Sequence, residues 1–334
     1  MRAADGIIAP VTAGSIHRRA ARPQLPAPTP LLRPLALVLA IALSAAAPSL
    51  AEAPAGEGWI SDLGVARERA KNENKPILVD LWAVWCTWCK RLEEDVFTKP
   101  VFQEFAKSYV LLRVDTDDGA SGRRLMVDFE VDSLPTMLVL THDLIKIGEL
   151  EGYLSAEPYV QSLALELAVY QELLDQYEQR SQASATATAT PAAVAVADPL
   201  QTLADELHAR HDGARAATLY REIIDRAAAA EKGSGNPEER AWNRFYYADS
   251  LRLKHDLEGA RREAVAAREA AAGIDNDELN ERIELLSFYL ARDADACTEA
   301  RQVIDRFLVE HPEGVLVDLA REEQRQLKTA EGCA

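Results

Sequence analysis

The chain has 334 residues, of which 48% are hydrophobic and 27% are charged, and this ordinary globular usage excludes a wholly disordered or collagen-like protein. At roughly 100 to 200 residues per domain, the length predicts about two domains. Acidic residues outnumber basic residues by 54 to 37 and give a net charge of −17, so the surface repels nucleic-acid phosphates and anionic membranes. We therefore expect no nucleic-acid partner.

Residues 1–51 have the pattern of a secretory signal peptide. Arginines precede an apolar run from Leu35 to Leu43, and the small-residue stretch SLAEA follows it. The run is shorter than the roughly 20 residues of a transmembrane helix. An uncleaved anchor is the alternative, and it is the only membrane contact that we expect. Removal of residues 1–51 takes away five arginines and one aspartate, so the net charge changes from −17 to −21.

We expect export to the periplasm of a Gram-negative bacterium, a compartment in which disulfides persist. The chain has four cysteines, Cys86, Cys89, Cys297 and Cys333. These are too few to build a disulfide scaffold, so each cysteine needs its own explanation.

Short apolar runs alternate with helical stretches in the first half of the exported chain. The runs at 77–83, 109–114 and 136–141 are short enough to be buried strands, and the second run contains a single arginine. The predicted helices are 63–74, 86–97, 101–108, 122–129 and 156–177. This alternation predicts an α/β sheet domain over residues 52–178.

The composition changes after residue 178. The stretch SQASATATATPAAVAVAD at 181–198 consists of small residues without an aromatic, which favours a flexible linker over residues 179–198. A continuation of the preceding helix is the alternative, but the alternating threonines and Pro191 speak against it.

Residues 199–334 contain helix-forming residues and no strand-like run. Three positions each precede a small residue by twelve, in the pairs Ala204 and Ala216, Ala248 and Ala260, and Phe288 and Ala300. This spacing resembles the tetratricopeptide repeat, in which small residues let paired helices pack closely. The resemblance implies a groove for a peptide or protein partner. An unrelated array of helical hairpins is the alternative.

The chemistry-bearing motif is WCTWCK at residues 85–90, which follows a predicted strand and opens a predicted helix. At a helix N-terminus, the sulfur of Cys86 faces unpaired backbone N–H groups and the positive end of the helix dipole, which stabilise a thiolate. Cys89 lies one turn later on the same face, near enough to resolve a mixed disulfide. The spacing therefore predicts thiol-disulfide exchange.

A metal is the alternative role for this cysteine pair. Structural zinc uses four ligands, and no second cysteine pair or histidine cluster accompanies Cys86 and Cys89 in the sequence. The histidines of the helical region, among them His311, are explained by solvent exposure or helix capping and need no metal. We expect no metal and no organic cofactor, because the cysteine pair itself carries the two electrons.

Residues 60–175 resemble the thioredoxin superfamily in three landmarks that occur in the family's order. These are the segment KPILVDLWAVWC ending at Cys86, Asp80 six residues before this cysteine, and SLPT at 133–136 before the third strand. The segment after Cys89 is most similar to the branch that contains the C-terminal domain of the periplasmic thiol:disulfide interchange protein.

The resemblance implies roles for individual residues. Asp80 matches the buried carboxylate that assists deprotonation of the resolving thiol, and Pro135 matches the cis-proline that shapes the substrate groove. The backbone of Leu134 would pair with an extended substrate, with Thr136 beside it. The alternatives are an acid that reaches solvent at a strand end and an ordinary proline at a strand start.

Thr87 and Trp88 stand between the cysteines, where thioredoxin has Gly-Pro and the periplasmic oxidase has Pro-His. These residues tune the stability of the reduced state. A histidine at this place is one feature that favours a strongly oxidising potential, and this chain has none there. We therefore expect a modestly reducing couple. Trp85 and Trp88 add aromatic surface that we expect to bind unfolded substrate. Local packing of both rings is the alternative.

Cys297 and Cys333 are expected to form a structural disulfide. If a helix from Cys297 ends near Glu310 and HPEG at 311–314 turns the chain into a returning helix, Cys333 comes back beside Cys297. The bond would close a loop of about 35 residues and contribute on the order of 3 to 4 kcal/mol. Two unpaired thiols are the alternative and would fit a cytoplasmic protein.

The sequence thus predicts an α/β thioredoxin-like fold followed by an all-α helical-repeat domain of the tetratricopeptide type. The predicted function is that of an exported thiol-disulfide oxidoreductase on protein substrates, a reductase rather than an oxidase, recharged by a redox donor protein. The alternative is a protein-binding adaptor with little redox turnover. Cys89, Asp80 and Pro135 favour the enzyme, because an adaptor has no need of them.

Overall fold

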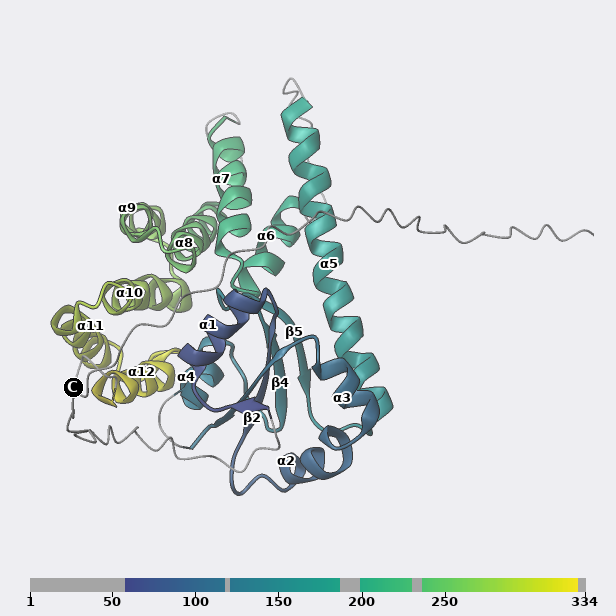
Figure 1. The fold of residues 1–334 in the computed structure, drawn as a ribbon. Helices are drawn as coiled ribbons and strands as arrows, with labels where there is room; N and C mark the ends of the chain where they lie inside the picture. Colours follow the sequence, from purple (N-terminus) through teal and green to yellow (C-terminus); the bar gives the residue numbers. More distant parts are fainter. Residues whose placement is uncertain (1–57, 118–120, 187–198, 230–235, 330–334) are drawn as a thin grey trace, which may run out of the picture. The chain divides into compact units, whose positions relative to one another are not determined.

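Figure 1 shows a mixed sheet with helices on its faces and a run of further helices after it. This computed structural model describes residues 58–117, 121–186, 199–229 and 236–329. The predicted signal peptide at 1–51 lies outside the described residues.

Five strands form one sheet in the order β1-β3-β2-β4-β5. Their bounds are β1 (Trp59–Ile60), β2 (Ile77–Trp82), β3 (Val110–Asp115), β4 (Thr136–Leu140) and β5 (Lys146–Glu151). The central strand β2 runs parallel to β3 and antiparallel to β4. The three predicted strands are confirmed as β2, β3 and β4. The prediction missed β1, which has two residues, and the edge strand β5, whose sequence KIGELE has no apolar run.

Helices cover both faces of this sheet. They are α1 (Leu63–Glu73), α2 (Thr87–Leu92), the π-helical turn η1 (Glu93–Phe97), α3 (Pro100–Ala106), α4 (Ser121–Asp128) and α5 (Ala156–Thr186). On one face, α1 and α4 bury Ala66 and Leu125 against the strands. On the other face, α3 and α5 bury Phe102 and Tyr159. The sheet domain therefore has two apolar layers with β2 between them.

Helix α5 is longer than predicted and corrects one boundary. It ends at Thr186, so residues 179–186 of the predicted linker are helical. The sequence QELLDQYEQRSQ keeps good helix formers up to residue 182, and the alternating β-branched threonines begin only at Thr186. The rest of the predicted linker, 187–198, lies outside the described residues.

From Pro199 onward, every element that the structure describes is a helix. The helices are α6 (Pro199–Ala209), α7 (Gly213–Ala229), α8 (Pro237–Leu253), α9 (Leu257–Ala271), α10 (Asp277–Arg292), α11 (Cys297–Glu310) and α12 (Val317–Thr329). The small residues of the predicted spacing are fully buried, among them Ala204, Ala216, Ala248 and Ala260. This all-helical region is consistent with a helical-repeat domain.

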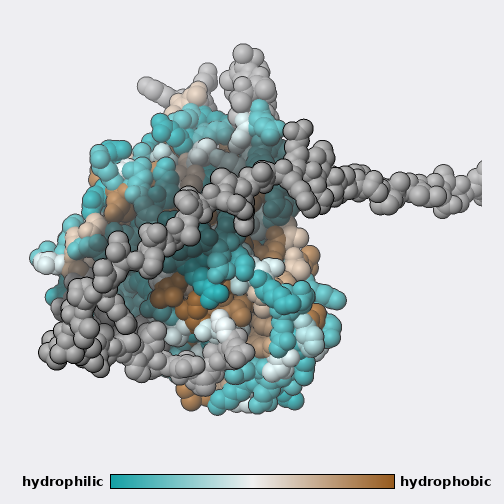
Figure 2. Space-filling view, in the orientation of Figure 1, coloured by the Kyte–Doolittle hydropathy of each residue, from teal (hydrophilic) through white to brown (hydrophobic). Residues whose placement is uncertain are grey.

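The described surface is mostly hydrophilic in the view of Figure 2, with separate hydrophobic patches. This agrees with a chain in which 27% of residues are charged. Within the described residues, none of the helices combines the length and the apolar character needed to cross a membrane.

Candidate active site

Cys86 and Cys89 form a disulfide between the end of β2 and the first turn of α2. Their sulfurs are 2.06 Å apart and their Cα atoms 5.3 Å apart. Cys86 is the N-cap of α2, and the backbone N–H of Cys89 donates to its Sγ at 3.1 Å. In the reduced protein, this donor and the helix end favour a thiolate on Cys86. Cys89 is the more deeply buried of the two, at 1% exposure.

Asp80 is buried in the middle of β2, with 1% of its surface exposed. This burial rules out a strand-end acid that reaches solvent. Burial raises the pKa of Asp80 to about 7, the positive charge of Arg113 opposes this rise, and the negative charge of Glu93 adds to it. A carboxyl with such a pKa exchanges its proton near neutral pH, which suits a group that accepts a proton from a thiol.

Arg113 and Glu93 complete this charge cluster and were missed in the sequence analysis. Arg113 pairs in register with Asp80 across β2 and β3. Its Nε lies 3.1 Å from Oδ2 of Asp80, and its second terminal nitrogen lies 2.9 Å from Oε2 of Glu93. The guanidinium is 5% exposed and lies over the Trp82 ring, 4.6 Å from the centroid. The Glu93 side chain is 39% exposed. Arg113 therefore forms ion pairs with both the buried carboxylate of Asp80 and the solvent-exposed carboxylate of Glu93.

The loop before β4 lies against the cysteines. The Leu134–Pro135 peptide bond is cis, and Leu134 packs against the cluster that contains Cys86 and Cys89. The carbonyl of Pro135 accepts a hydrogen bond from the Gly152 N–H at 2.8 Å. The hydroxyl of Thr136 is buried and donates to the Ser133 carbonyl at 2.8 Å. Thr136 therefore helps to hold the loop, and its contact with substrate stays a prediction.

Two exposed tryptophans belong to the cysteine motif. Trp85 is 67% exposed and Trp88 is 51% exposed, so a large part of each residue reaches solvent, although both side chains also make local contacts. The indole N–H of Trp85 donates to Oδ2 of Asp117 at 2.6 Å. The ring of Trp88 lies 5.4 Å from that of Tyr153, whose hydroxyl donates to Asp95 at 3.1 Å. Tyr153 was not predicted, since nothing in the sequence connects the β5–α5 loop with the cysteine motif.

The second predicted cysteine pair is only partly described. Cys297 begins α11, which ends at Glu310, and α12 returns from Val317 to Thr329. The predicted helical hairpin is therefore present. Cys333 lies outside the described residues, so the disulfide between Cys297 and Cys333 stays a prediction.

Residues 58–141 match the thioredoxin-like family model. The match begins before β1 and ends after β4, and it contains the cysteine pair, Asp80 and the cis-proline loop. Fold and site together define a thioredoxin-like domain that carries a Cys-x-x-Cys disulfide, followed by an all-helical region.

Relatives of known function include thiol:disulfide interchange proteins. The chain is 37% identical over 84 residues to DsbD of Pseudomonas fluorescens, which is 25% of this chain and 14% of that protein. It is 32% identical over 97 residues to DsbD of Pasteurella multocida, which is 28% of this chain and 17% of that protein. The thioredoxin-like domain is thus related to thiol-disulfide oxidoreductases, while the chain spans under a fifth of the length of these relatives.

Two solved structures are each similar to about a third of the chain. The DsbH oxidoreductase has a TM-score of 0.30 and 19% identity, and the match covers 33% of this chain and 83% of that one. The oxidised C-terminal domain of Neisseria meningitidis DsbD has a TM-score of 0.28 and 20% identity, and the match covers 31% of this chain and 94% of that one.

Proposed function

We propose that this protein is an exported thiol-disulfide oxidoreductase that reduces disulfides in protein substrates. The observation that carries the proposal is the Cys86–Cys89 disulfide at a helix N-terminus, in the same domain as a buried carboxylate of raised pKa. A cysteine pair with a purely structural role needs neither feature. The relationship of the domain to thiol:disulfide interchange proteins supports the same chemistry.

Reduction begins with the reduced pair. The Cys86 thiolate attacks one sulfur of the substrate disulfide, this S–S bond breaks, and the departing sulfur leaves as a thiolate that takes up a proton. Cys89 then loses its proton and attacks Sγ of Cys86. The mixed disulfide breaks, the second substrate sulfur leaves, and the Cys86–Cys89 disulfide forms. Two electrons have passed from the cysteine pair to the substrate.

Asp80 is the group that we assign to the proton of Cys89. A carboxylate with a pKa of about 7 accepts a proton at neutral pH and releases it again. The positive charge of Arg113 keeps part of the Asp80 population ionised. Glu93 also pairs with this guanidinium and reaches solvent, so we propose that the proton leaves Asp80 for solvent on the Glu93 side.

The direction of electron flow rests on the residues between the cysteines. No histidine stands beside Cys86 to support a strongly oxidising couple, so we assign the protein to the reductases. A reductase must be recharged by a redox donor protein. We propose the periplasm as its location, because disulfides persist in that compartment.

The substrate surface is formed by exposed aromatic rings. Trp85 precedes Cys86 and Trp88 stands between the two cysteines, and both residues present exposed apolar area next to the disulfide, to which an extended segment can adapt. The loop at Leu134 packs against the same cysteines. We therefore propose unfolded or extended segments around a disulfide as the substrate class.

The test is a trapping experiment. Cys89→Ala cannot resolve the mixed disulfide, so we expect a covalent complex with a disulfide-containing unfolded protein, which mass spectrometry identifies through Cys86. The matched control is Cys86→Ala, which should trap nothing. A Cys89→Ala protein that forms no complex, while the wild type also leaves the substrate disulfide unreduced, would remove the enzyme proposal.

A second candidate function is that of a binding protein, favoured by a separate observation on the helices. The ring of Tyr246 stacks on two neighbours, with centroid distances of 5.7 Å to Tyr220 and 5.5 Å to Trp242. Tyr220 and Tyr246 line a cavity of about 720 Å³. We propose that this region holds a peptide or protein partner. The trapping experiment separates the two, because an adaptor forms no mixed disulfide.

A further inference from the structure

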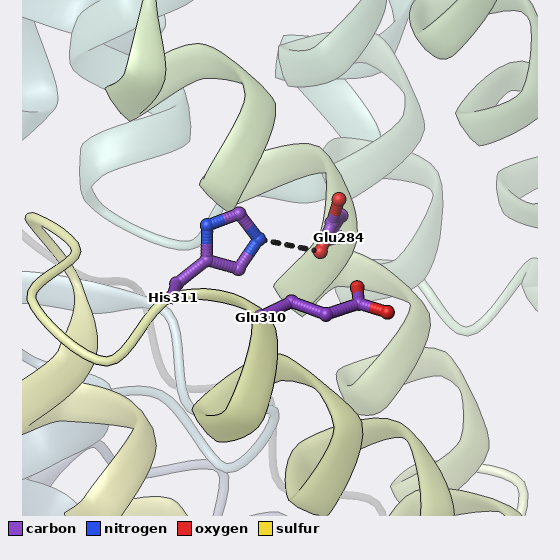
Figure 3. Close-up of side chains that lie close together, drawn as sticks. All are labelled: Glu284, Glu310 and His311. Atoms are coloured by element: carbon purple, nitrogen blue, oxygen red, sulfur yellow. Dashed lines mark hydrogen bonds and ion pairs between the residues drawn. The ribbon is translucent and has the colours of Figure 1, made fainter.

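A second group of chemistry-bearing side chains lies where α10 meets the end of α11. Glu284 lies on α10, Glu310 is the last residue of α11, and His311 follows it. Figure 3 shows that these three side chains approach one another. One ligand atom from each lies within 4.8 Å of the other two, and Nε2 of His311 is 3.0 Å from Oε2 of Glu284. Imidazole nitrogen and carboxylate oxygen are both zinc ligands.

The imidazole of His311 is held in place from two sides. The ring of Phe307 packs against it at a centroid distance of 4.7 Å. Its Nδ1 lies 3.9 Å from Oε1 of Glu281, a side chain that is 3% exposed. The backbone N–H groups of Val315 and Leu316 donate to the two oxygens of Glu281 at 3.1 and 2.7 Å. The fixed Glu281 carboxylate beside Nδ1 orients the ring, as outer-shell carboxylates orient metal-bound histidines. Nε2 donates to Oε2 of Glu284, and a bound ion would replace the proton on Nε2.

The turn after α11 is built around the Glu281 carboxylate. A Cβ atom at Gly314 would lie 2.5 Å from Oε1 of Glu281, so this position admits only glycine without a shift. The turn HPEG therefore fixes the position of Glu281 and, through it, the orientation of His311.

The group carries more negative than positive charge. Among the described residues, the only ion pairs of Glu281 and Glu284 are those with His311, and no lysine or arginine pairs with Glu281, Glu284 or Glu310. The C-terminal end of α11 adds a negative partial charge at the same place. A single histidine cannot neutralise three carboxylates, whereas a divalent cation offsets two of these charges.

We propose that Glu284, Glu310 and His311 bind a Zn²⁺ ion, with Glu281 orienting the imidazole. The mixed nitrogen and oxygen donor set favours zinc over Mg²⁺ and Ca²⁺, which take oxygen ligands. Three protein ligands leave a fourth position of the zinc tetrahedron for water. The ion would tie α10 to the end of α11, and this inference is independent of the proposed redox function. It also replaces the solvated or capping role expected for His311.

The test is a calorimetric titration of the full chain with Zn²⁺. Because reduced cysteines bind zinc, the protein is used with the Cys86–Cys89 disulfide formed and with any remaining thiols alkylated. We expect one ion per chain. Glu310→Gln removes one ligand from a carboxylate that has no ion pair among the described residues, and we expect it to weaken binding at least about 10-fold. His311→Gln should weaken binding by a similar or larger factor.

The matched control is Glu313→Gln, which changes an exposed carboxylate in the same turn and should leave the zinc affinity at the wild-type value. Absence of stoichiometric binding overturns the proposal. So does binding that Glu310→Gln and His311→Gln leave unchanged, or binding that equal concentrations of Mg²⁺ or Ca²⁺ abolish.

Discussion

Asp80→Asn should make the oxidised protein more stable at pH 8 while it slows thiol exchange. The wild-type carboxyl must lose its proton in a buried site at this pH, and the asparagine amide avoids that cost. Stability and activity therefore change in opposite directions at this position. A residue whose role is only structural would lower both.

The size and sign of the effect follow from the pKa. Burial raises the pKa of Asp80 from 3.8 to about 7, so the folded protein binds this proton more tightly than the unfolded chain does. The stability gained from proton binding is complete below about pH 4 and is lost as the pH rises through 7. A pKa difference of this size corresponds to about 4 kcal/mol. We expect Asp80→Asn to be about 2 to 4 kcal/mol more stable at pH 8 and close to wild type at pH 4.

The assay is urea unfolding of the oxidised protein at pH 4 and pH 8. Four of the five tryptophans lie in the thioredoxin-like domain, so tryptophan fluorescence reports mainly on this domain. The matched control is Glu68→Gln, which changes an exposed carboxylate of α1 in the same domain and should alter stability equally little at both pH values. Equal effects of Asp80→Asn at pH 4 and pH 8, or a loss of stability at pH 8, would refute the reasoning.

Three further changes test neighbouring parts of the account. Arg113→Met removes the cation that lowers the pKa of Asp80, so this pKa should rise by roughly 1 to 3. The midpoint of the pH profile for thiol exchange should then move upward, and Arg113→Lys should return most of this midpoint to the wild-type value. Trp88→Ala should raise KM for an unfolded protein substrate by roughly 3- to 10-fold and leave exchange with glutathione unchanged. Cys297→Ser should remove about 3 to 4 kcal/mol from the helical region if the bond to Cys333 forms, measured by circular dichroism during thermal unfolding under oxidising conditions; a reducing agent should abolish the difference.

The parts of the fold and site that are local in sequence could be predicted. β2 and β3 are buried on both faces, so their apolar runs identified them. Asp80 stood out because a lone acid in such a run needs a task or a partner. Arg113 carried the same signal as a lone base in the run of β3, but only the register between β2 and β3 shows that the two charges meet.

The parts that depend on tertiary contacts could not be predicted. Tyr153 lies beside Trp88 although 65 positions separate them, and no periodicity joins a loop to a helix start. The end of α5 was placed too early, because composition alone did not separate helical QRSQ from the threonines that follow it. Thr136 stands in the expected loop, but the direction of its hydroxyl depends on the local turn and not on the residue type.

The reduction potential of the Cys86–Cys89 pair distinguishes a reductase from a strong oxidant. The oxidised protein is equilibrated with mixtures of reduced and oxidised glutathione, and mass spectrometry of the alkylated cysteines gives the reduced fraction. The account predicts a reversible couple closer to thioredoxin's potential of about −270 mV than to the value of about −120 mV of a strong oxidant. A potential near −120 mV would contradict the reductase assignment, and a pair that never exchanges would contradict the enzyme itself.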